Sequence, residues 1–152
     1  MNKILSLLLL LCMVFSLTSC EKNVDAYDLL TEFISTYGAE GIIYSPVVPE
    51  GDDGYVRDGL TKRIYLYSGE FPENYAIFFN GHTDFSSECA IFVCTDADML
   101  AMVEEMSLER IRLVASGADH AFVRKSGSIC FYSTMKDRAR AEKIFSEIIR
   151  KL

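Results

Sequence analysis

One short stretch of the chain gathers the side chains that acid–base or metal chemistry requires. Residues 81–88 read Gly-His-Thr-Asp-Phe-Ser-Ser-Glu, which places His82, Asp84 and Glu88 close together in the sequence. An imidazole and two carboxylates are groups that act as general acid and base or hold a divalent metal ion. The stretch also has the polar composition of a loop between two strands. We favour the loop, because no second histidine is fixed nearby by the sequence.

The other candidates for chemistry lack the spacing that their chemistry needs. Asp119-His120 stands alone at the start of a predicted strand. Asp52, Asp53 and Asp58 lie in a predicted loop, but they do not follow the ligand order of a calcium-binding loop. The chain contains no G-x-S-x-G, H-E-x-x-H or P-loop motif. We therefore expect no catalytic residue, no metal site and no cofactor.

The first 20 residues have the order of a secretory signal. Lys3 precedes an apolar run of about 14 residues, shorter than the roughly 20 that a membrane-spanning helix needs. The run ends in Leu17-Thr18-Ser19-Cys20, which resembles the lipobox of bacterial lipoproteins. The resemblance implies that residues 1–19 are removed as a signal peptide and that the Cys20 thiol carries a diacylglyceryl group. Such a chain is anchored on the extracytoplasmic face of the cell membrane without spanning it.

The part after the signal has the size of one domain. Residues 20–24 form a tether of about five residues, which reaches about 15 to 18 Å when extended and keeps the domain close to the membrane. Residues 25–152 are enough for a single hydrophobic core. Without the signal, 14 basic and 22 acidic side chains remain, a net charge of −8. This balance argues against a general nucleic-acid binder.

The charge is unevenly distributed along the chain. Residues 21–60 hold nine acidic and two basic side chains, whereas residues 119–152 hold four acidic and eight basic ones. Solvated faces of unequal sign are the interpretation that we favour. Contact of the basic C-terminal part with lipid headgroups or an acidic partner is the alternative.

Three cysteines remain once Cys12 is removed and Cys20 is lipidated. Cys89 and Cys94 belong to one predicted strand and lie five residues apart, so they point to opposite faces and cannot easily pair with each other. We favour buried, reduced thiols, with a disulfide between Cys94 and Cys130 as the alternative.

Hydrophobic periodicity predicts the elements that carry these residues. Amphipathic helices are expected from Asp25 to Gly38, after Thr95 and after Asp137, each beginning at a side chain that caps helices well. The methionines of the middle helix, Met99, Met102 and Met106, follow helical spacing and are expected in the core.

Strands are expected where aromatic and β-branched residues cluster between turn residues. The expected strands cover residues 41–44, 75–79, 89–94, 120–124 and 129–133, and the second of the two long apolar runs, 89–94, should be central because it is apolar on both faces. Residues 60–68 fit either a strand or a short helix, and we lean towards the helix.

This order of elements predicts an α+β fold, a two-layer sandwich with helices packed on one face of an antiparallel sheet. The strands Tyr75-Ala76-Ile77-Phe78 and Glu88-Cys89-Ala90-Ile91-Phe92, together with the closing strand and helix, resemble an uncharacterised family of small lipoproteins of Gram-positive bacteria. The resemblance implies a compact lipid-anchored domain and no particular activity.

We therefore expect a non-catalytic, lipid-anchored binding or interaction module of the bacterial envelope, held to the membrane through Cys20, with an envelope protein as its further partner. A small enzyme or metal-binding protein using His82, Asp84 or Glu88, and an inhibitor or accessory subunit of a membrane complex, remain alternatives. A flat apolar surface would favour a protein partner. A groove of exposed aromatic side chains would favour a ligand or glycan; the candidates are Tyr55, Tyr65, Tyr67 and Tyr75.

Overall fold

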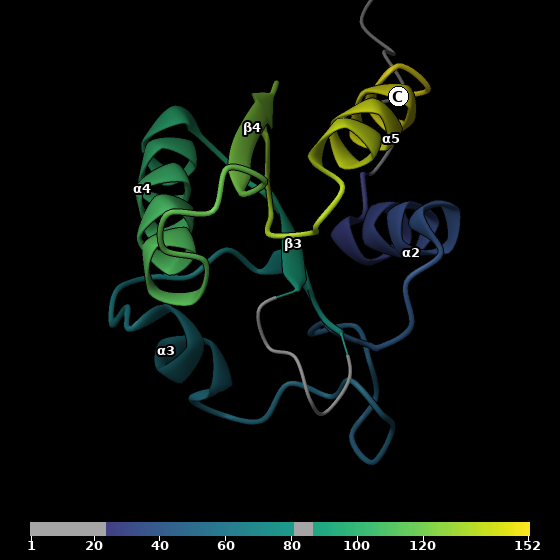
Figure 1. Cartoon of the computed structure of the whole chain (residues 1–152). Helices are drawn as coiled ribbons and strands as arrows, with labels where there is room; N and C mark the ends of the chain where they lie inside the picture. The colour runs from purple at the N-terminus through teal and green to yellow at the C-terminus, as the bar shows by residue number, and fades with distance from the viewer. Residues whose placement is uncertain (1–23, 81–86) are drawn as a thin grey trace, which may run out of the picture.

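The computed structural model describes residues 24–80 and 87–152, which build a sheet with helices packed on it (Figure 1). In chain order the elements are α2 (Ala26–Tyr37), β1 (Ile42–Tyr44), α3 (Leu60–Tyr65), β2 (Asn74–Phe79), β3 (Glu88–Val93), α4 (Ala97–Val114), β4 (Phe122–Ser126), β5 (Ile129–Ser133) and α5 (Arg138–Ile149). The strands lie in the order β1-β2-β3-β5-β4, and every neighbouring pair is antiparallel. The predicted α+β class and the central position of residues 89–94 are confirmed.

The helices cover both faces of the sheet, so that the domain has three layers where the sequence predicted two. Figure 1 shows α2 and α5 on one side of the sheet and α3 and α4 on the other. The reason lies in β3, where Cys89 and Ile91 belong to the core under α2 and α5 while Ala90 and Phe92 belong to the core under α3 and α4. Alternate residues of a strand point to opposite faces, so a strand that is apolar throughout needs cover on both.

Aromatic rings form the core beneath α2 and α5. The Phe131 ring, from β5, stacks on Phe145 of α5 with centroids 4.5 Å apart and meets Phe33 of α2 at 4.9 Å. All three side chains are buried. Burial of one such side chain contributes about 1.5–3 kcal/mol, so these contacts hold both helices against this face.

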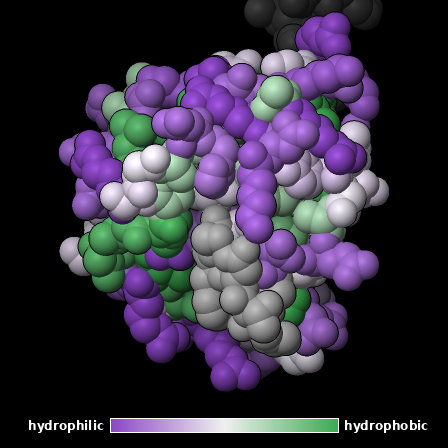
Figure 2. All heavy atoms as spheres, in the orientation of Figure 1, coloured by the Kyte–Doolittle hydropathy of each residue, from purple (hydrophilic) through white to green (hydrophobic). Residues whose placement is uncertain are grey.

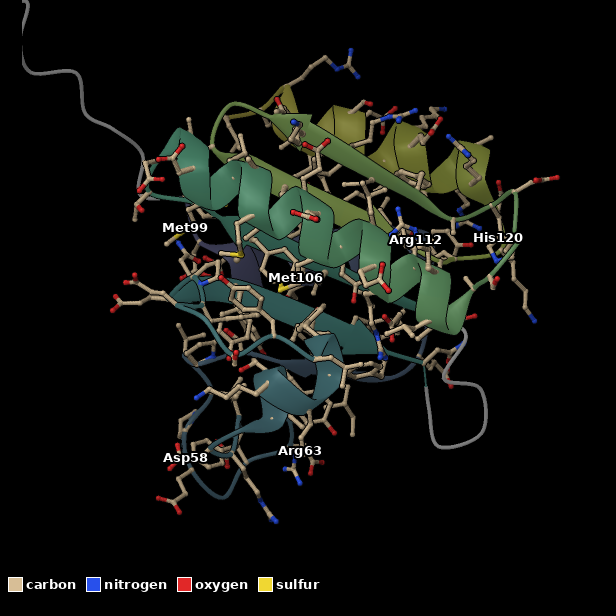
Figure 3. The ribbon with its side chains drawn as sticks, turned by 90° about the vertical axis from the view of Figure 1, so that its left-hand side faces the viewer. Asp58, Arg63, Met99, Met106, Arg112 and His120 are labelled. Atoms are coloured by element: carbon tan, nitrogen blue, oxygen red, sulfur yellow. The ribbon has the colours of Figure 1, made fainter. Side chains whose placement is uncertain are left out.

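The core beneath α3 and α4 contains the predicted methionines. Met106 is buried, and Met99 and Met102 are partly buried and pack against the same cluster. Figure 3 shows Met99 and Met106 on the side of α4 that faces the sheet and α3. Their assignment to the core is confirmed.

Capping side chains set the helix ends. The Asp25 carboxylate accepts hydrogen bonds from the backbone N–H groups of Tyr27 and Asp28, and Gly38 ends α2 with a φ of 74°. Both ends agree with the prediction. At α4 the cap is Asp96 and not Thr95, because the Asp96 carboxylate accepts the Met99 N–H at 2.8 Å.

Two further segments decide open points of the sequence. Residues Leu60–Tyr65 are helical, as we leaned towards, and the chain turns out of α3 at Leu66, whose φ of 52° is unusual for a residue with a side chain. The strand expected over residues 120–124 is β4, which begins two residues later because the Ala121 N–H is bonded to the Ala118 carbonyl in a turn.

The two edges of the sheet differ. At one edge β1 is only three residues long, and the following Ser45 is bridged to Tyr55 of the loop that comes before α3. At the other edge β4 presents Arg124 and Lys125, which form ion pairs with Glu142 and Glu104 respectively.

The chain enters the domain next to β2. The Asn74 side chain donates a hydrogen bond to the Val24 carbonyl at 2.8 Å and accepts one from the Ala26 N–H at 2.9 Å. Val24, the first described residue, also packs against the core beneath α2 and α5. Among residues 24–80 and 87–152, no helix has the length and apolar character needed to cross a membrane.

Candidate functional site

Of the three residues proposed for acid–base or metal chemistry, one lies in the part of the chain that the structure describes. His82 and Asp84 fall outside the described residues. Glu88 is the first residue of β3, and its side chain is completely buried. A carboxylate without solvent contact must be paired or hydrogen-bonded, so its partners decide what it can do.

Arg110 of α4 is the main partner of Glu88. Its Nε donates to Glu88 Oε1 and its Nη2 donates to Glu88 Oε2, both at 2.7 Å, and the Arg110 side chain is only 15% exposed. This is the two-pronged geometry in which a guanidinium fits a carboxylate best. Burial opposes the charged guanidinium, but the hydrogen bonds and the negative charge of Glu88 outweigh that penalty, so that the pKa of Arg110 is raised.

Two tyrosines complete this buried network. The Tyr132 hydroxyl donates to Glu88 Oε1 at 2.9 Å, and it lies 3.0 Å from the Tyr65 hydroxyl. Burial raises the pKa of both phenols well above the ordinary value, so both stay protonated at neutral pH. Both oxygens of Glu88 therefore already have donors, which leaves this carboxylate no role in acid–base chemistry with an external molecule.

The network joins four elements. Arg110 also donates from Nη1 to the Ile64 carbonyl of α3 at 3.0 Å, while Tyr132 belongs to β5 and Glu88 to β3. The backbone N–H of Glu88 is fixed as well, since it donates to the Thr134 hydroxyl at 2.8 Å. Glu88, which the sequence left as part of an alternative acid–base stretch, lies at a junction between the sheet, α3 and α4.

Arg110 was missed by the sequence analysis, although the sequence carries a signal for it. Val103, Met106 and Ser107 are buried, and Arg110 follows them by seven, four and three residues respectively, which is helical spacing. A cation at a position that continues a buried helical stripe needs a buried anion.

The four tyrosines considered for a groove of exposed aromatic side chains do not all lie at the surface. Tyr65 and Tyr75 are buried in the core beneath α3 and α4, and Tyr67 is partly buried against it. Their rings pack against that core, and the centroids of the Tyr75 and Phe92 rings are 6.4 Å apart. Tyr55 lines a cavity next to the loop before α3.

That cavity has a volume of about 450 Å³ and lies between β1, the loop of residues 46–59 and α3. Its lining combines charged, aromatic and aliphatic side chains with two glycines: Ile42, Tyr44, Gly51, Asp52, Asp53, Gly54, Tyr55, Arg57, Leu60 and Arg63. A second cavity of about 400 Å³ shares Gly51, Tyr55 and Arg57 with it. The sequence predicted no calcium site at Asp52, Asp53 and Asp58, and among the described residues no group of three or more His, Cys, Asp or Glu side chains could hold a metal ion.

Three of the exposed large apolar side chains belong to the layer that α3 and α4 form, or directly follow it in the chain. Leu108 and Leu113 of α4 are 42% and 51% exposed, and Leu66, directly after α3, is 74% exposed. Arg110 ties the two elements together here through the Ile64 carbonyl. Figure 2 shows a hydrophobic area on this side, bordered by hydrophilic side chains.

The three cysteines of the described chain are free and buried, as we favoured. Cys89 packs beneath α2 and α5, whereas Cys94 and Cys130 pack beneath α3 and α4. Burial raises the pKa of Cys94 to about 11 and that of Cys130 to about 12, and it raises the pKa of Cys89 as well. Thiols of this kind are unreactive, which fits a packing role.

Several basic side chains of the C-terminal part of the chain form contacts within the domain. Arg138 binds Glu142 at 3.0 Å along the same helix, and Lys151 binds Glu32 of α2 at 2.5 Å. The Arg140 guanidinium lies over the Tyr37 ring. These contacts agree with the interpretation of a solvated face.

The predicted lipid-attachment residue, Cys20, lies outside the described residues, as does the signal peptide of residues 1–19. Comparisons of the chain with protein-family models, with curated proteins and with solved structures find no significant match. The candidate site therefore has to be interpreted from its own residues.

Proposed function

We propose that this chain is a non-catalytic interaction module of the bacterial envelope, anchored at the extracytoplasmic face of the cell membrane by a lipid on Cys20. The anchor is supported by the sequence, in which a short apolar signal ends in Leu-Thr-Ser-Cys. Val24 is bonded to Asn74 and packs against the core, so a lipid on Cys20 would hold the domain close to the membrane.

A protein partner is supported by the exposed leucines, and this observation carries the proposal. Of the five large apolar side chains that are exposed in the described chain, Leu66, Leu108 and Leu113 belong to the side that α3 and α4 form. Exposed apolar side chains grouped on one surface and bordered by polar ones are typical of protein interaction sites. Figure 2 shows hydrophobic surface on this side of the molecule with hydrophilic side chains next to it.

An enzyme receives less support from the described residues. Of His82, Asp84 and Glu88, the structure describes Glu88, whose Oε1 accepts hydrogen bonds from Arg110 and Tyr132 and whose Oε2 accepts one from Arg110. An inhibitor or accessory subunit of a membrane complex would itself be an interaction module, so the same test covers it.

Two experiments test the proposal. Cys20→Ser should leave the signal uncleaved or release the chain from membranes, and normal cleavage with unchanged membrane attachment would refute the anchor. For the partner, a photo-crosslinking amino acid is placed at Leu108 in intact cells, with exposed Lys143 of α5 as the matched control position.

A discrete crosslinked product at residue 108 that is missing at residue 143 is the expected result. It should disappear when Leu66 and Leu113 are both changed to Lys, because charged side chains are depleted from the centres of interfaces. Equal products at both positions, or none at residue 108, would contradict the interaction surface.

A further inference from the structure

The cavity beneath the loop of residues 46–59 holds charges of both signs that do not neutralise one another. Arg57 and Arg63 line it together with Asp52 and Asp53. Within the described chain, no ion pair is found for either arginine. This differs from Arg110, whose guanidinium binds a carboxylate.

We infer that this cavity binds a small zwitterion of the amino-acid or short-peptide type. Its carboxylate would be held by Arg57 and Arg63, and its ammonium group would face Asp52 and Asp53. A guanidinium offers a planar set of donors that matches a carboxylate. Cations and anions that face the same space without pairing leave room for a ligand that carries both charges.

The lining also fits such a ligand in size and in its apolar part. A volume of about 450 Å³ is within the range of roughly 300–1,000 Å³ that small-molecule sites have. Ile42, Leu60 and the rings of Tyr44 and Tyr55 supply apolar wall next to the charges. A short aliphatic or aromatic side chain of the ligand would lie against them.

The walls of the cavity are held by contacts with β1. The Ser45 N–H donates to the Gly54 carbonyl at 3.2 Å, and Ser45 is bridged to Tyr55. Gly54 approaches β1 so closely that a Cβ atom there would lie 2.1 Å from the Ile43 carbonyl oxygen, and its φ is 95°. The Tyr44 ring meets Phe79 edge-on at 5.8 Å. A site with fixed walls loses less entropy when a ligand binds.

The two arginines come from different elements. Arg63 lies on α3, and Arg57 lies in the loop that precedes it. Figure 3 shows Arg63 and Asp58 pointing away from the core on this side of the molecule. Arg57 also lines the neighbouring cavity of about 400 Å³, so a ligand longer than one residue would extend past Tyr55 into it. This inference does not depend on the lipid anchor or on the protein partner.

Binding is tested by adding a panel of free amino acids and alanine-containing dipeptides to the purified full chain. Changes in the NMR chemical shifts of the backbone amides measure it. We expect saturable shifts for at least one member of the panel, centred on residues 51–63. For that compound, N-acetylation and C-terminal amidation should each weaken binding about tenfold or more, since each removes one charge (tenfold is about 1.4 kcal/mol).

A double variant, Arg57→Gln with Arg63→Gln, should weaken binding by a similar factor, whereas Arg112→Gln, on an exposed face of α4, should leave it unchanged. Absence of saturable binding for the whole panel would overturn the inference. Equal binding of the N-acetylated compound, or tighter binding of inorganic phosphate, would also overturn it, since either result describes a site for anions alone. Because the blocked compounds are tested on the unchanged protein, the result does not depend on how the variants fold.

Discussion

The buried pair of Glu88 and Arg110 gives the sharpest test of how this fold is stabilised. In Arg110→Met the aliphatic part of the side chain is kept, but the buried carboxylate loses the donors at 2.7 Å on each of its oxygens, and the Ile64 carbonyl loses its donor. Removing one partner of a buried ion pair costs about 3–5 kcal/mol, because an unpaired charge stays behind. That is a large part of the roughly 5–15 kcal/mol by which domains are stable.

Urea unfolding followed by circular dichroism measures the effect. With a slope of about 2 kcal/mol per molar urea, a loss of about 4 kcal/mol lowers the midpoint by about 2 M. Arg112→Met is the matched control, since it is the same substitution on the same helix and removes an exposed ion pair with Glu109. An exposed pair contributes about 0–1 kcal/mol, so this control should change little.

A second substitution separates the charge from the packing. If the loss in Arg110→Met comes from the unpaired carboxylate, adding Glu88→Gln should restore part of the stability, because a neutral amide costs less to bury. If Arg110→Met and Arg112→Met differ by less than about 1 kcal/mol, the buried network does not stabilise the fold as described.

Other parts of the structure give further predictions. The hydrogen bond from the Met99 backbone N–H lowers the pKa of the Asp96 carboxyl group. The stabilisation by this cap is therefore present above the pKa that the carboxyl has in the unfolded chain, and it is lost as the pH falls through the lower pKa of the folded state. Asp96→Ala should lower the melting temperature at pH 7 but not at pH 2. With pKa values of about 11 and about 12, the thiols of Cys94 and Cys130 should resist iodoacetamide at pH 8 and react only in urea; rapid alkylation of the folded chain would contradict their burial. Gly54→Ala should displace the loop from β1 and lower the melting temperature, whereas Gly51→Ala, with open space around its Cβ position, should do so less.

Local signals in the sequence predicted most of the elements correctly. Asp25 and Gly38 mark the ends of α2 because capping depends on residues within one turn of the helix end. The apolar run of residues 89–94 predicted a central strand because a strand without a polar face cannot lie at an edge. Both features depend on neighbours in the sequence, which is why they were predictable.

The features that depend on distant residues were missed. A helical stripe shows that a helix is covered on one side, but not which face of the sheet covers it, so the third layer was not predicted. The partner of Glu88 lies 22 residues away in another element, and Glu88 was grouped with the residues adjacent to it in the sequence. The tyrosines at 65 and 75 were expected at the surface, because a phenol ring fits both a surface and a core; Tyr65 is buried where its hydroxyl meets that of Tyr132.

The charged edge of the sheet has a consequence if the proposed lipid anchor crowds copies of this domain on a membrane. Unpaired backbone groups of an edge strand invite pairing with the edge of another copy, and anchoring in two dimensions raises the local concentration at which copies meet. Arg124 and Lys125 point to opposite faces of β4 and are held there by Glu142 and Glu104, so a second strand would have to approach past two ordered cations. The short β1 and its loop protect the opposite edge. Dense lateral packing of this domain should therefore not lead to sheet-to-sheet aggregation.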